Sequence, residues 1–519
     1  YCHFGLAAGL KQELVNNPSF CRLGHLSIHV NIDGVPLFKS SNDQFWPILG
    51  MVHQQSAEPF VIGLFHGKCK PKNPTEYLGD FVAEAQELLQ DGLLHERKQY
   101  QVSIAAFVCD APARSFLKQV KQHNGYHSCE KCSQPGEWHH DERRMAYPEM
   151  NARLRTDASF NSRTDEDHHI AESPLSVLPI GLVSQFPLDY MHLVCLGVVR
   201  RLISLWVDGP LQVRMPHNVR VSISEHLESL QHYTPVDFAR KPRSLFERSR
   251  WKATECRLFL LYTGPLVLKD NLPSELYQNF MLLSSAIRIL AHPCLCYEFA
   301  DFAKTLLVQF VEHFAELYGS DQVVYNIHNL VHLPDDCKVH GHLDSFSSFP
   351  FENFLGQMKR LIRKQNQVMS QVIRRLAEMS KADKKRVSSA PLLSQEHFRG
   401  PLLSDMCAFV PVHQFKKLSL KSCTVGINQG DCCVKINGIV CVVKNILSTS
   451  QGSQVIFSEF LQTDSFFAYP FDSSRIGVFK VSHLSNELKI ASSRDIQLKY
   501  ALFPSSGKYV AFPILHTSV

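Results

Sequence analysis

The chain of 519 residues is too long for one ordinary hydrophobic core, so two or three domains are expected. Hydrophobic residues make up 45% of it and charged residues 20%, which excludes a disordered or collagen-like protein. The formal net charge of +5 is concentrated, because residues 359–386 hold ten lysines and arginines against two acids. Such a patch is typical of a phosphate-binding surface, with a solvated helix face as the alternative.

Targeting signals and the number and spacing of cysteines predict the compartment in which the protein resides. The longest apolar run, around residues 256–268, is interrupted by Gly264 and Pro265, so no membrane-spanning segment is expected. Sixteen cysteines at irregular intervals in a long chain predict a reduced, intracellular compartment. The chain begins at Tyr1 without a methionine or a signal-peptide pattern, so we expect that it lacks its true N-terminus and any domain located there.

Three strands, a helix and a fourth strand are expected first. Residues 25–38 alternate between apolar and polar side chains, and residues 45–54 and 59–67 follow at hairpin spacing. Residues 73–94 open with an Asn-Pro start signal and have helical spacing, whereas the nearly continuous apolar run at 101–112 predicts a strand buried on both faces. This order of elements is the opening of a ribonuclease H-like α/β unit.

In the remainder of the chain the expected secondary structure changes from loop to helix and then to strand. Residues 136–174 are polar and predict a long loop, and residues 175–320 are mostly helical by pattern. A further helix is expected from Glu352 to about Lys385, and short β-rich runs near the C-terminus predict a barrel. The predicted fold class is therefore α/β, with four segments: a ribonuclease H-like core in two parts, 1–135 and 321–390, a mainly helical insertion over 136–320, and a small all-β domain over 405–519.

Three acids occupy positions where ligands collect. Asp33 ends the first strand, Asp110 ends the buried strand, and Glu352 starts the late helix. Three carboxylates from separate elements suffice to hold two Mg²⁺ (or Mn²⁺) ions roughly 3.5–4 Å apart for phosphoryl transfer. Each acid has a structural alternative: Asp110 as a helix cap, Asp33 in a hairpin turn, and Glu352 as a favourable charge at a helix N-terminus.

The helix that follows Glu352 supports the catalytic interpretation. At helical spacing Gly356, Lys359 and Arg363 lie on the same face as Glu352, and we expect Gly356 to let another backbone approach closely. Four cations are predicted to hold DNA phosphates: Lys359, Arg360, Arg363 and Lys364. The alternative is a surface ion pair between Glu352 and a nearby lysine.

A second cluster predicts a structural zinc ion. Cys129 and Cys132 have the two-residue separation of a zinc knuckle, and His328 and His332 are four apart, so on a helix their rings project from one side. Together they would tie the segment after Asp110 to the segment before Glu352. A redox pair and two ordinary core histidines are the alternatives, and His127 and His139 are substitute ligands.

These motifs together resemble a known family. Asp33 in NIDGVPLF, Asp110 in VCDAPAR, the C-x-x-C motif, the D-x-x-H of LDYMHL, and HNLVH followed by FPFENFLG are similar to the catalytic core of CACTA (En/Spm)-type cut-and-paste transposases. The resemblance covers about residues 1–390. A more distant likeness is to the Transib transposases and the catalytic subunit of the V(D)J recombinase.

The resemblance implies a Mg²⁺-dependent DDE transposase or endonuclease. Asp33, Asp110 and Glu352 would ligate two divalent ions, and the two cysteines and two histidines would hold zinc. Asp189 and His192 match the D-x-x-H signature and would position the cleaved DNA end; the alternative is that LDYMHLVCLG is a buried helix with a satisfied histidine. DNA would be the partner, the nucleus the location, and a homo-oligomer the active form.

One departure from the family leaves other functions open. No DNA-end-binding domain is recognisable in the sequence, so a domesticated, catalytically silent derivative that binds DNA or protein is the alternative. In that case the C-terminal β domain would be the protein-binding module. A third interpretation is a zinc-stabilised scaffold in which the acids are only caps and turn residues.

Overall fold

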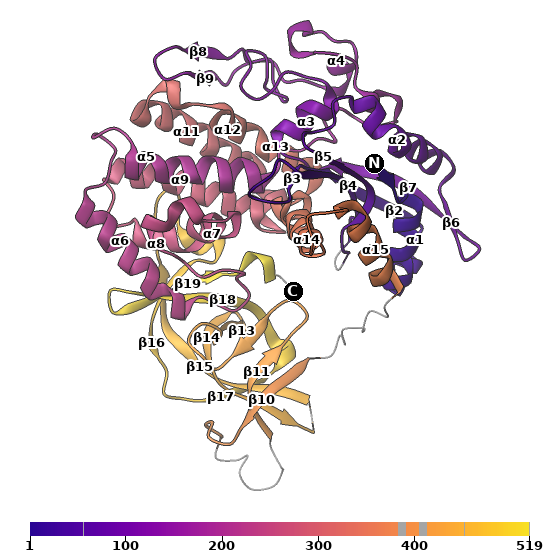
Figure 1. Cartoon of the computed structure of the whole chain (residues 1–519). Coiled ribbons are helices and arrows are strands. Elements are labelled where there is room, and N and C mark those ends of the chain that lie inside the picture. Colours follow the sequence, from indigo (N-terminus) through magenta and orange to yellow (C-terminus); the bar gives the residue numbers. More distant parts are fainter. Residues whose placement is uncertain (55–56, 382–390, 404–412, 451, 518–519) are drawn as a thin grey trace. The chain divides into compact units, whose positions relative to one another are not determined.

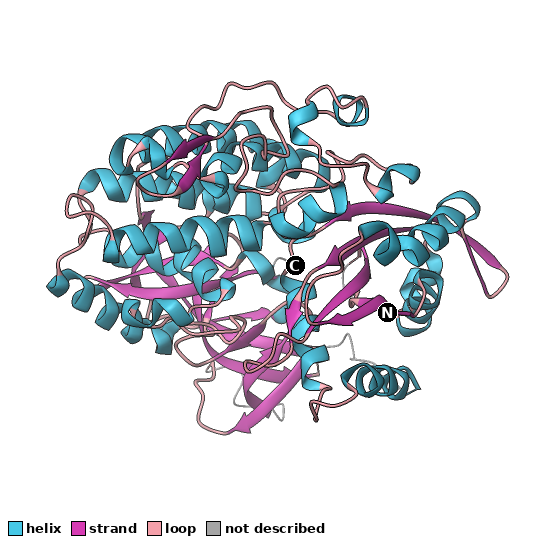
Figure 2. Cartoon of the chain, turned by 45° about the horizontal axis from the view of Figure 1, so that its top comes forward, coloured by secondary structure: helices cyan, strands magenta, loops and turns pink. Residues whose placement is uncertain are grey.

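The computed structural model describes residues 1–54, 57–381, 391–403, 413–450 and 452–517 (Figure 1). The fold is mixed α/β, with a helical middle and C-terminal β-structure, as predicted (Figure 2). The chain forms two compact units, each built from two stretches: Tyr1–Gly197 with Phe314–Lys385, and Val198–His313 with Arg386–Val519. Within the described residues, no helix combines the length and the hydropathy needed to cross a membrane.

The first unit is organised around a mixed β-sheet with the strand order β1-β5-β4-β2-β7-β6, and β3 pairs with β4 at its side. Strands β2 and β7 are parallel, and the other neighbours are antiparallel. The predicted strands and the predicted helix α2 are confirmed. The bounds are β1 Cys2–His3, β2 His25–Ile32, β3 Val35–Pro36, β4 Gln44–Val52, β5 Phe60–Gly67, α2 Pro74–Asp91, β6 Leu93–His95 and β7 Lys98–Phe107.

Both faces of β2 are buried, although its sequence alternates between apolar and polar residues. Its apolar set packs in a core with the helices α1 (Leu6–Asn16) and α2. The other set was expected to form a polar face, but His29 is 1% and Asn31 2% exposed. The Asn31 amide nitrogen donates to the carbonyl of Val108 (2.7 Å), just beyond β7, whereas its buried Oδ1 has no hydrogen-bond partner among the described residues.

The segment after β7 connects the sheet to the rest of the first unit. Helix α3 (Ala111–Lys118) begins at once, and the polar stretch at 136–174 contains only short elements: β8 Glu137–His139, β9 Arg144–Ala146 and α4 Asp157–Asn161. Later come α11 Ala300–Tyr318, α12 Tyr325–His328, the 3₁₀ turn Asn329–His332 and α13 Leu333–His340.

The single late helix predicted from Glu352 to Lys385 is wrong. The chain forms α14 (Phe349–Arg360) and, after a break, α15 (Val368–Lys381). The Gln371 side chain stabilises the break by accepting from the Arg363 and Lys364 amides and donating to the Lys364 carbonyl, and Gln367 has a left-handed φ of 53°. Residues 382–386 of the predicted basic patch, and parts of the predicted segments 321–390 and 405–519, lie outside the described residues.

The second unit combines helices from the middle of the chain with the C-terminal strands. The β-structure begins at Leu392, earlier than the predicted 405. The helices are α5 Arg200–Asp208, α6 His217–Ser229, α7 Ala253–Leu258, α8 Gly264–Val267, α9 Ser274–Ala291 and α10 Leu295–Glu298. The strands are β10 Leu392–His397, β11 His413–Ser419, β12 Thr424–Gly426, β13 Cys433–Ile436, β14 Ile439–Thr449, β15 Gly452–Ser465, β16 Phe479–Leu484, β17 Lys489–Ser492, β18 Ile496–Ser505 and β19 Lys508–Pro513.

Six of these strands close into an antiparallel barrel. Each neighbour in the ring β13-β14-β15-β16-β19-β18 is hydrogen-bonded, and β18 pairs again with β13. Closure leaves these strands without free edges, which agrees with the predicted barrel.

A buried lysine joins the barrel to the helical part of the same unit. The Lys499 ammonium, on β18, is fully buried and lies 2.5 Å from Asp237 Oδ2 and 2.6 Å from Asp431 Oδ1. Asp237 also accepts from the backbone amide of Thr424, and Asp431 from that of Val236. Because one buried cation pairs with two carboxylates, removing any of the three charges leaves a buried charge without its partner.

Replacing Lys499 with methionine should therefore destabilise the second unit by about 3–5 kcal/mol, because two buried carboxylates lose their cation. The measurement is urea unfolding followed by fluorescence of Trp206 and Trp251, which belong to this unit. Lys489→Met, which removes the more exposed Lys489–Glu459 pair, is the control and should leave the midpoint nearly unchanged. Equal midpoints for both variants would contradict the role given to Lys499.

Candidate functional site

The parallel register of β2 and β7 brings two of the predicted acids side by side. Val30 is opposite Phe107, and the Val108 amide continues the ladder by donating to the Val30 carbonyl (2.8 Å). Three residues beyond this pair on each strand are Asp33 and Asp110. Both therefore emerge at the carboxyl edge of the sheet, where ligands of α/β proteins bind.

Glu352 and His192 complete a group of donors at this edge. One ligand atom from each of Asp33, His192 and Glu352 lies within 4.8 Å of the other two. Glu352 is in the first turn of α14 and lies close to Asp33, and no ion pair joins it to a lysine within the described residues, so the predicted alternative of a surface ion pair does not form there. The three donors come from distant parts of the sequence.

Asp189 holds this group in place without joining it. Its side chain is fully buried, and its Oδ2 lies 2.6 Å from Nδ1 of His192. Its Oδ1 accepts from the Ser348 amide (2.7 Å), immediately before α14 begins. The D-x-x-H motif thus orients the His192 ring, leaves Nε2 for the acids, and fastens the start of the helix that carries Glu352.

Burial and neighbouring charges shift the pKa values of this group. Burial, the charge of Asp110 and the hydrogen bond with Glu352 raise the pKa of Asp33 well above its ordinary value. Burial opposes protonation of His192, but the hydrogen bond that its ring donates to Asp189 and the charges of the nearby acids raise its pKa to about 9. Carboxylates this close repel one another unless a proton or a metal ion lies between them.

Asp110 has a double role. Its Oδ1 accepts from the Ala113 amide (2.8 Å), so it is the N-cap of α3, as the structural alternative predicted. It does not belong to the compact donor group, yet its charge acts on both Asp33 and His192. A cavity of about 170 Å³ is lined by Asp110, His123 and His192, among others.

The predicted turn role of Asp33 is not observed in its hairpin form. Strand β3, which follows Asp33 and Gly34, pairs with β4 and not with β2.

Asp33 and Glu352 supply the hard oxygen donors that Mg²⁺ and Mn²⁺ prefer, and the imidazole nitrogen of His192 suits Mn²⁺ better than Mg²⁺. The residues present therefore fit one divalent ion directly, with Asp110 adjacent to it.

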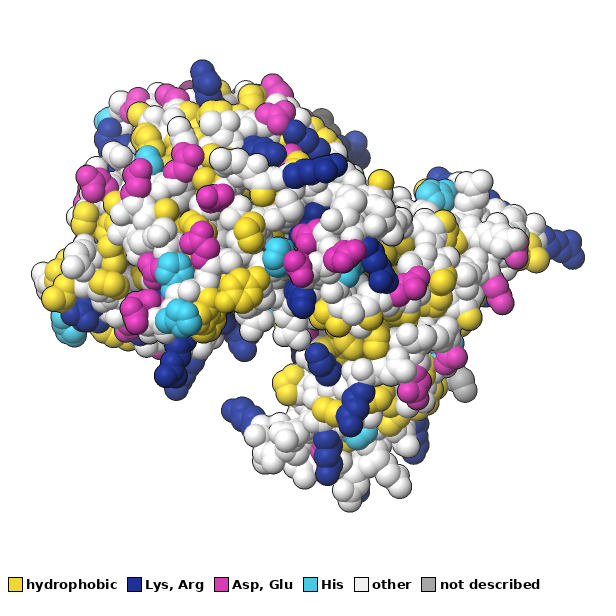
Figure 3. Space-filling model, turned by 90° about the horizontal axis from the view of Figure 1, so that it is seen from above, with side chains coloured by type: hydrophobic (Ala, Val, Ile, Leu, Met, Phe, Trp, Pro, Cys, Tyr) yellow, Lys and Arg dark blue, Asp and Glu magenta, His cyan; other side chains and the backbone are white. Residues whose placement is uncertain are grey.

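The four predicted DNA-binding cations are exposed near the end of α14: Lys359, Arg360, Arg363 and Lys364. Lys359 donates through Nζ to the carbonyl of Pro36 (2.6 Å), close in sequence to Asp33. Arg363 lies beyond the helix end, so the predicted common face with Glu352 stops at Lys359. The face in Figure 3 shows cations interspersed with acids rather than one continuous basic surface.

The role predicted for Gly356 is wrong. A Cβ added there would meet no atom within 4 Å, so no backbone approaches this residue closely. The helical spacing correctly placed Gly356 one turn beyond Glu352, but spacing on one helix carries no information about what packs against it.

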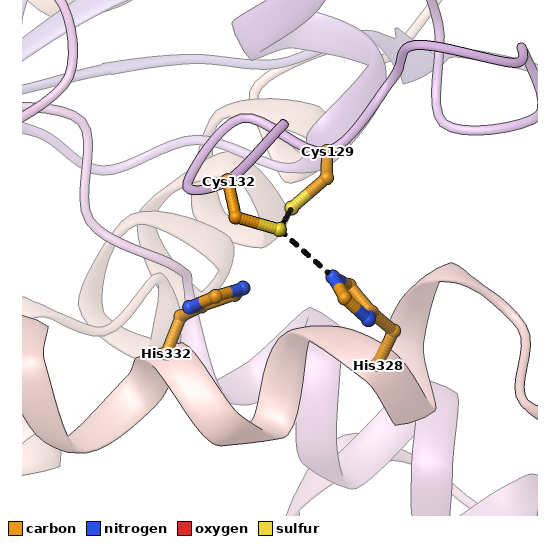
Figure 4. A group of neighbouring side chains, drawn as sticks. All are labelled: Cys129, Cys132, His328 and His332. Carbon is orange, nitrogen blue, oxygen red and sulfur yellow. Dashed lines mark hydrogen bonds between the residues drawn. The ribbon is translucent and has the colours of Figure 1, made fainter. Parts of the chain in front are cut away.

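The predicted zinc ligands converge in the interior of the first unit (Figure 4). The Cys129 and Cys132 sulfur atoms are 3.5 Å apart, and Cys132 Sγ is 3.3 Å from His328 Nε2. All four residues are buried, and their ligand atoms lie within 4.8 Å of one another. Tetrahedral zinc with bonds of roughly 2.0–2.3 Å separates its ligands by about 3.3–3.8 Å, so the spacing fits.

The sulfur chemistry of this cluster favours a metal over a redox pair. Every cysteine in the described part of the chain is unbridged, and a separation of 3.5 Å is far above a disulfide bond length. Burial opposes ionisation of Cys129, but hydrogen bonds from Cys132 and the charge of His328 lower its pKa well below the ordinary value, and the neighbouring sulfur in turn raises the pKa of Cys132. A dication would let both thiols ionise.

The two histidines differ in which ring nitrogen lacks a partner. Among the described residues the buried Nε2 of His332 has no hydrogen-bond partner, as expected where a metal is the partner. In His328 the nitrogen without a partner is Nδ1, whereas Nε2 is the one that lies against Cys132. The substitute ligands proposed from sequence lie elsewhere: His127 faces Asp165 and Asp167, and His139 is outside the four-residue group.

Sequence reasoning missed a buried ionic network between the two centres. Glu130, inside the C-x-x-C loop, lies 3.0 Å from Arg114 Nε and 2.9 Å from Lys118 Nζ, and all three are at most 3% exposed. Arg114 also donates to the Cys109 carbonyl and to the Tyr325 hydroxyl. The i, i+4 spacing of Arg114 and Lys118 on α3 was the only signal. The network ties α3, which Asp110 caps, to the cysteine loop.

Comparison with known proteins adds one finding. Residues 396–514 match a family described as a domain of unknown function (DUF8592), a range that runs through strands β10 to β19. No curated protein matches the chain.

Cys129→Ser should remove the predicted zinc and destabilise the first unit, because metal binding and folding are coupled. Elemental analysis of the purified chain should give about one zinc per molecule, falling to about zero in the variant. Cys296→Ser, a buried cysteine outside the cluster, is the matched control and should keep its metal. Equal zinc content and equal melting temperatures in all three proteins would reject the site.

Proposed function

We propose that the first unit is the core of a DDE-type transposase, or of a protein derived from one, that cleaves and transfers DNA strands with divalent metal ions. The observation that carries the proposal is the convergence of Asp33, His192 and Glu352 at the carboxyl edge of the sheet, with the charge of Asp110 beside them. Three oxygen donors from separate elements are the set that such chemistry requires.

The sheet topology supports a ribonuclease H-like core within this proposal. Strands β5, β4 and β2 are consecutive antiparallel neighbours, a helix follows, and β7 then joins β2 in parallel. The two acids at the ends of β2 and β7 are thereby adjacent, and α14 delivers the third. The resemblance to CACTA-type transposases stays a proposal that rests on these motifs.

Each residue of the group has a definable task. Asp33 and Glu352 would hold Mg²⁺ or Mn²⁺, with Asp110 close enough to take part, and bound ions would supply activation of water and neutralisation of phosphate charge. Asp189 fixes the orientation of His192, so the imidazole adds a directed nitrogen or, when protonated, a cation at the phosphate. Zinc held by Cys129, Cys132, His328 and His332 would be structural.

DNA is the proposed partner, held by the exposed cations at the end of α14. Because Lys359 bonds the segment just after Asp33, it places positive charge next to the acid group. The reaction would take place in the nucleus, and a homo-oligomer would be the active form, since strand transfer acts on two DNA ends.

One observation favours the second candidate, a catalytically silent derivative. Asp110 already satisfies the N-terminus of α3, and it does not join the compact donor group. A protein that keeps the fold and binds DNA without cutting it would need Asp110 only as a helix cap.

Glu352→Gln separates the two candidates. It removes one metal-binding charge but keeps the shape of the side chain, so an enzyme should lose about 10²–10³-fold or more of its cleavage rate and keep its DNA affinity. The assay is nicking of supercoiled plasmid in Mg²⁺ or Mn²⁺, with DNA affinity measured alongside.

Glu378→Gln is the matched control, because this acid lies on α15 and pairs only with Arg374 and Arg375. It should cleave at the normal rate. Absence of metal-dependent nicking by the unaltered chain on any DNA tested would reject the enzyme and leave the binding protein.

Backbone binding by the cations should appear as salt dependence. The logarithm of the DNA association constant should fall with the logarithm of salt concentration, and Arg363→Ala combined with Lys364→Ala should lower the slope by about two, because about one counterion is released for each phosphate contacted. Lys338→Ala, a cation beside Asp335, should leave the slope unchanged. A salt-insensitive complex would contradict this DNA-binding surface.

A further inference from the structure

A hollow opens at one end of the C-terminal barrel. It has a volume of about 380 Å³, and its floor includes Val442, Phe460 and Leu502, from β14, β15 and β18. The same three side chains belong to the apolar cluster inside the barrel. The hollow is therefore the mouth of the barrel interior, a position where β-barrels commonly bind ligands.

The rim of this mouth is cationic and aromatic. Lys444 and Lys508 line it together with His483, and Tyr233 and Tyr509 add two phenol rings. Among the described residues that line the hollow, none is acidic. Two ammonium groups above an apolar floor complement a ligand that is anionic and carries an apolar group.

One rim residue has an unusual backbone. His483 has a φ of 56°, in the left-handed region that a histidine seldom adopts, and its ring lies 3.2 Å from the Gln462 amide oxygen. Strained backbone of this kind concentrates at binding sites, where the surrounding structure holds it.

A second hollow continues the first. It has a volume of about 340 Å³ and shares Gly507, Lys508 and Tyr509 with the barrel mouth. Gly507 lies in the turn between β18 and β19, and Lys508 and Tyr509 begin β19, so both hollows are lined by the same hairpin. The second hollow is also lined by Asp270, so the barrel mouth is the part that complements a carboxylate.

We propose that the barrel mouth binds an acidic segment of a partner protein, with an apolar side chain on the floor and carboxylates at Lys444 and Lys508. One apolar floor with two lysines at its rim favours this occupant over single-stranded nucleic acid, which binds along a continuous positively charged groove with a row of stacking rings. The proposal does not depend on the activity proposed for the first unit.

The test uses the full chain and an array of short synthetic peptides, each with one Leu, Ile, Phe or Trp flanked by Asp and Glu. Two matched sets replace the acids by Asn and Gln, or the apolar residue by Ser. Fluorescence anisotropy should show binding by the acidic apolar peptides and at least about tenfold weaker binding by both matched sets.

Lys444→Glu combined with Lys508→Glu should lower the affinity of the best peptide by at least about tenfold, and the milder pair Lys444→Gln with Lys508→Gln should lower it less. Lys416→Glu, an exposed lysine on β11 that does not line the hollow, should change nothing. Melting temperatures equal to that of the unaltered chain establish that the variants are folded.

Three results would overturn the proposal. The first is equal binding of the acidic and neutral peptides, and the second is binding that survives both pairs of lysine substitutions. The third is tight binding of oligo(dT), lost in the Lys444→Glu and Lys508→Glu variant, with no peptide bound. That last result would make the mouth a nucleic-acid site.

Discussion

Electrostatic repulsion among carboxylates is the constraint on which the first unit depends. The parallel ladder between β2 and β7 places Asp33 beside Asp110, and α14 adds Glu352 to the same edge. Folding therefore gathers carboxyl groups that water would keep apart, and burial together with the charge of Asp110 raises the pKa of Asp33. Packing elsewhere holds this arrangement, and a bound cation would relieve the repulsion. Asp189 contributes to that packing by fastening both the His192 ring and the start of α14.

The cysteine and histidine cluster solves a similar problem in the interior. Two buried thiols 3.5 Å apart would need a cation for both to ionise, and with the two buried imidazoles beside them they would make a neutral set around Zn²⁺. Glu130 lies between the two cysteines in sequence and forms an ion pair with Arg114 on α3. This ion pair connects the cysteine loop to the helix that Asp110 caps. A structural metal would thereby stabilise the same edge of the sheet that gathers the acids.

The second unit uses buried charge differently. Lys499 and its two aspartates form a closed set that joins barrel strands to residues from the middle of the chain, so the helices and the C-terminal strands of this unit are built together. The barrel mouth, in contrast, carries lysines around an apolar floor with no acid lining it among the described residues. The first arrangement pairs its charges within the unit, and the second leaves lysines at a hollow, where we propose that they meet an acidic ligand.

The sequence by itself determined the local features. Alternation and helical spacing located β2, β4, β5, β7 and α2, because a period of two or 3.6 residues is a property of neighbouring side chains. Spacing and residue chemistry also picked out the two cysteines and two histidines that lie together in the structure, and zinc binding by them stays a prediction. Spacing gave wrong or no predictions where contacts between distant residues determine the structure. The late helix is interrupted where the Gln371 side chain bonds the backbone, and Gly356 has no close neighbour among the described residues. Glu130 forms its ion pair with a residue of α3. Only the tertiary structure placed His192 with Asp33 and Glu352, because the register of parallel strands and the seating of α14 are set by packing between remote segments, which no local pattern encodes.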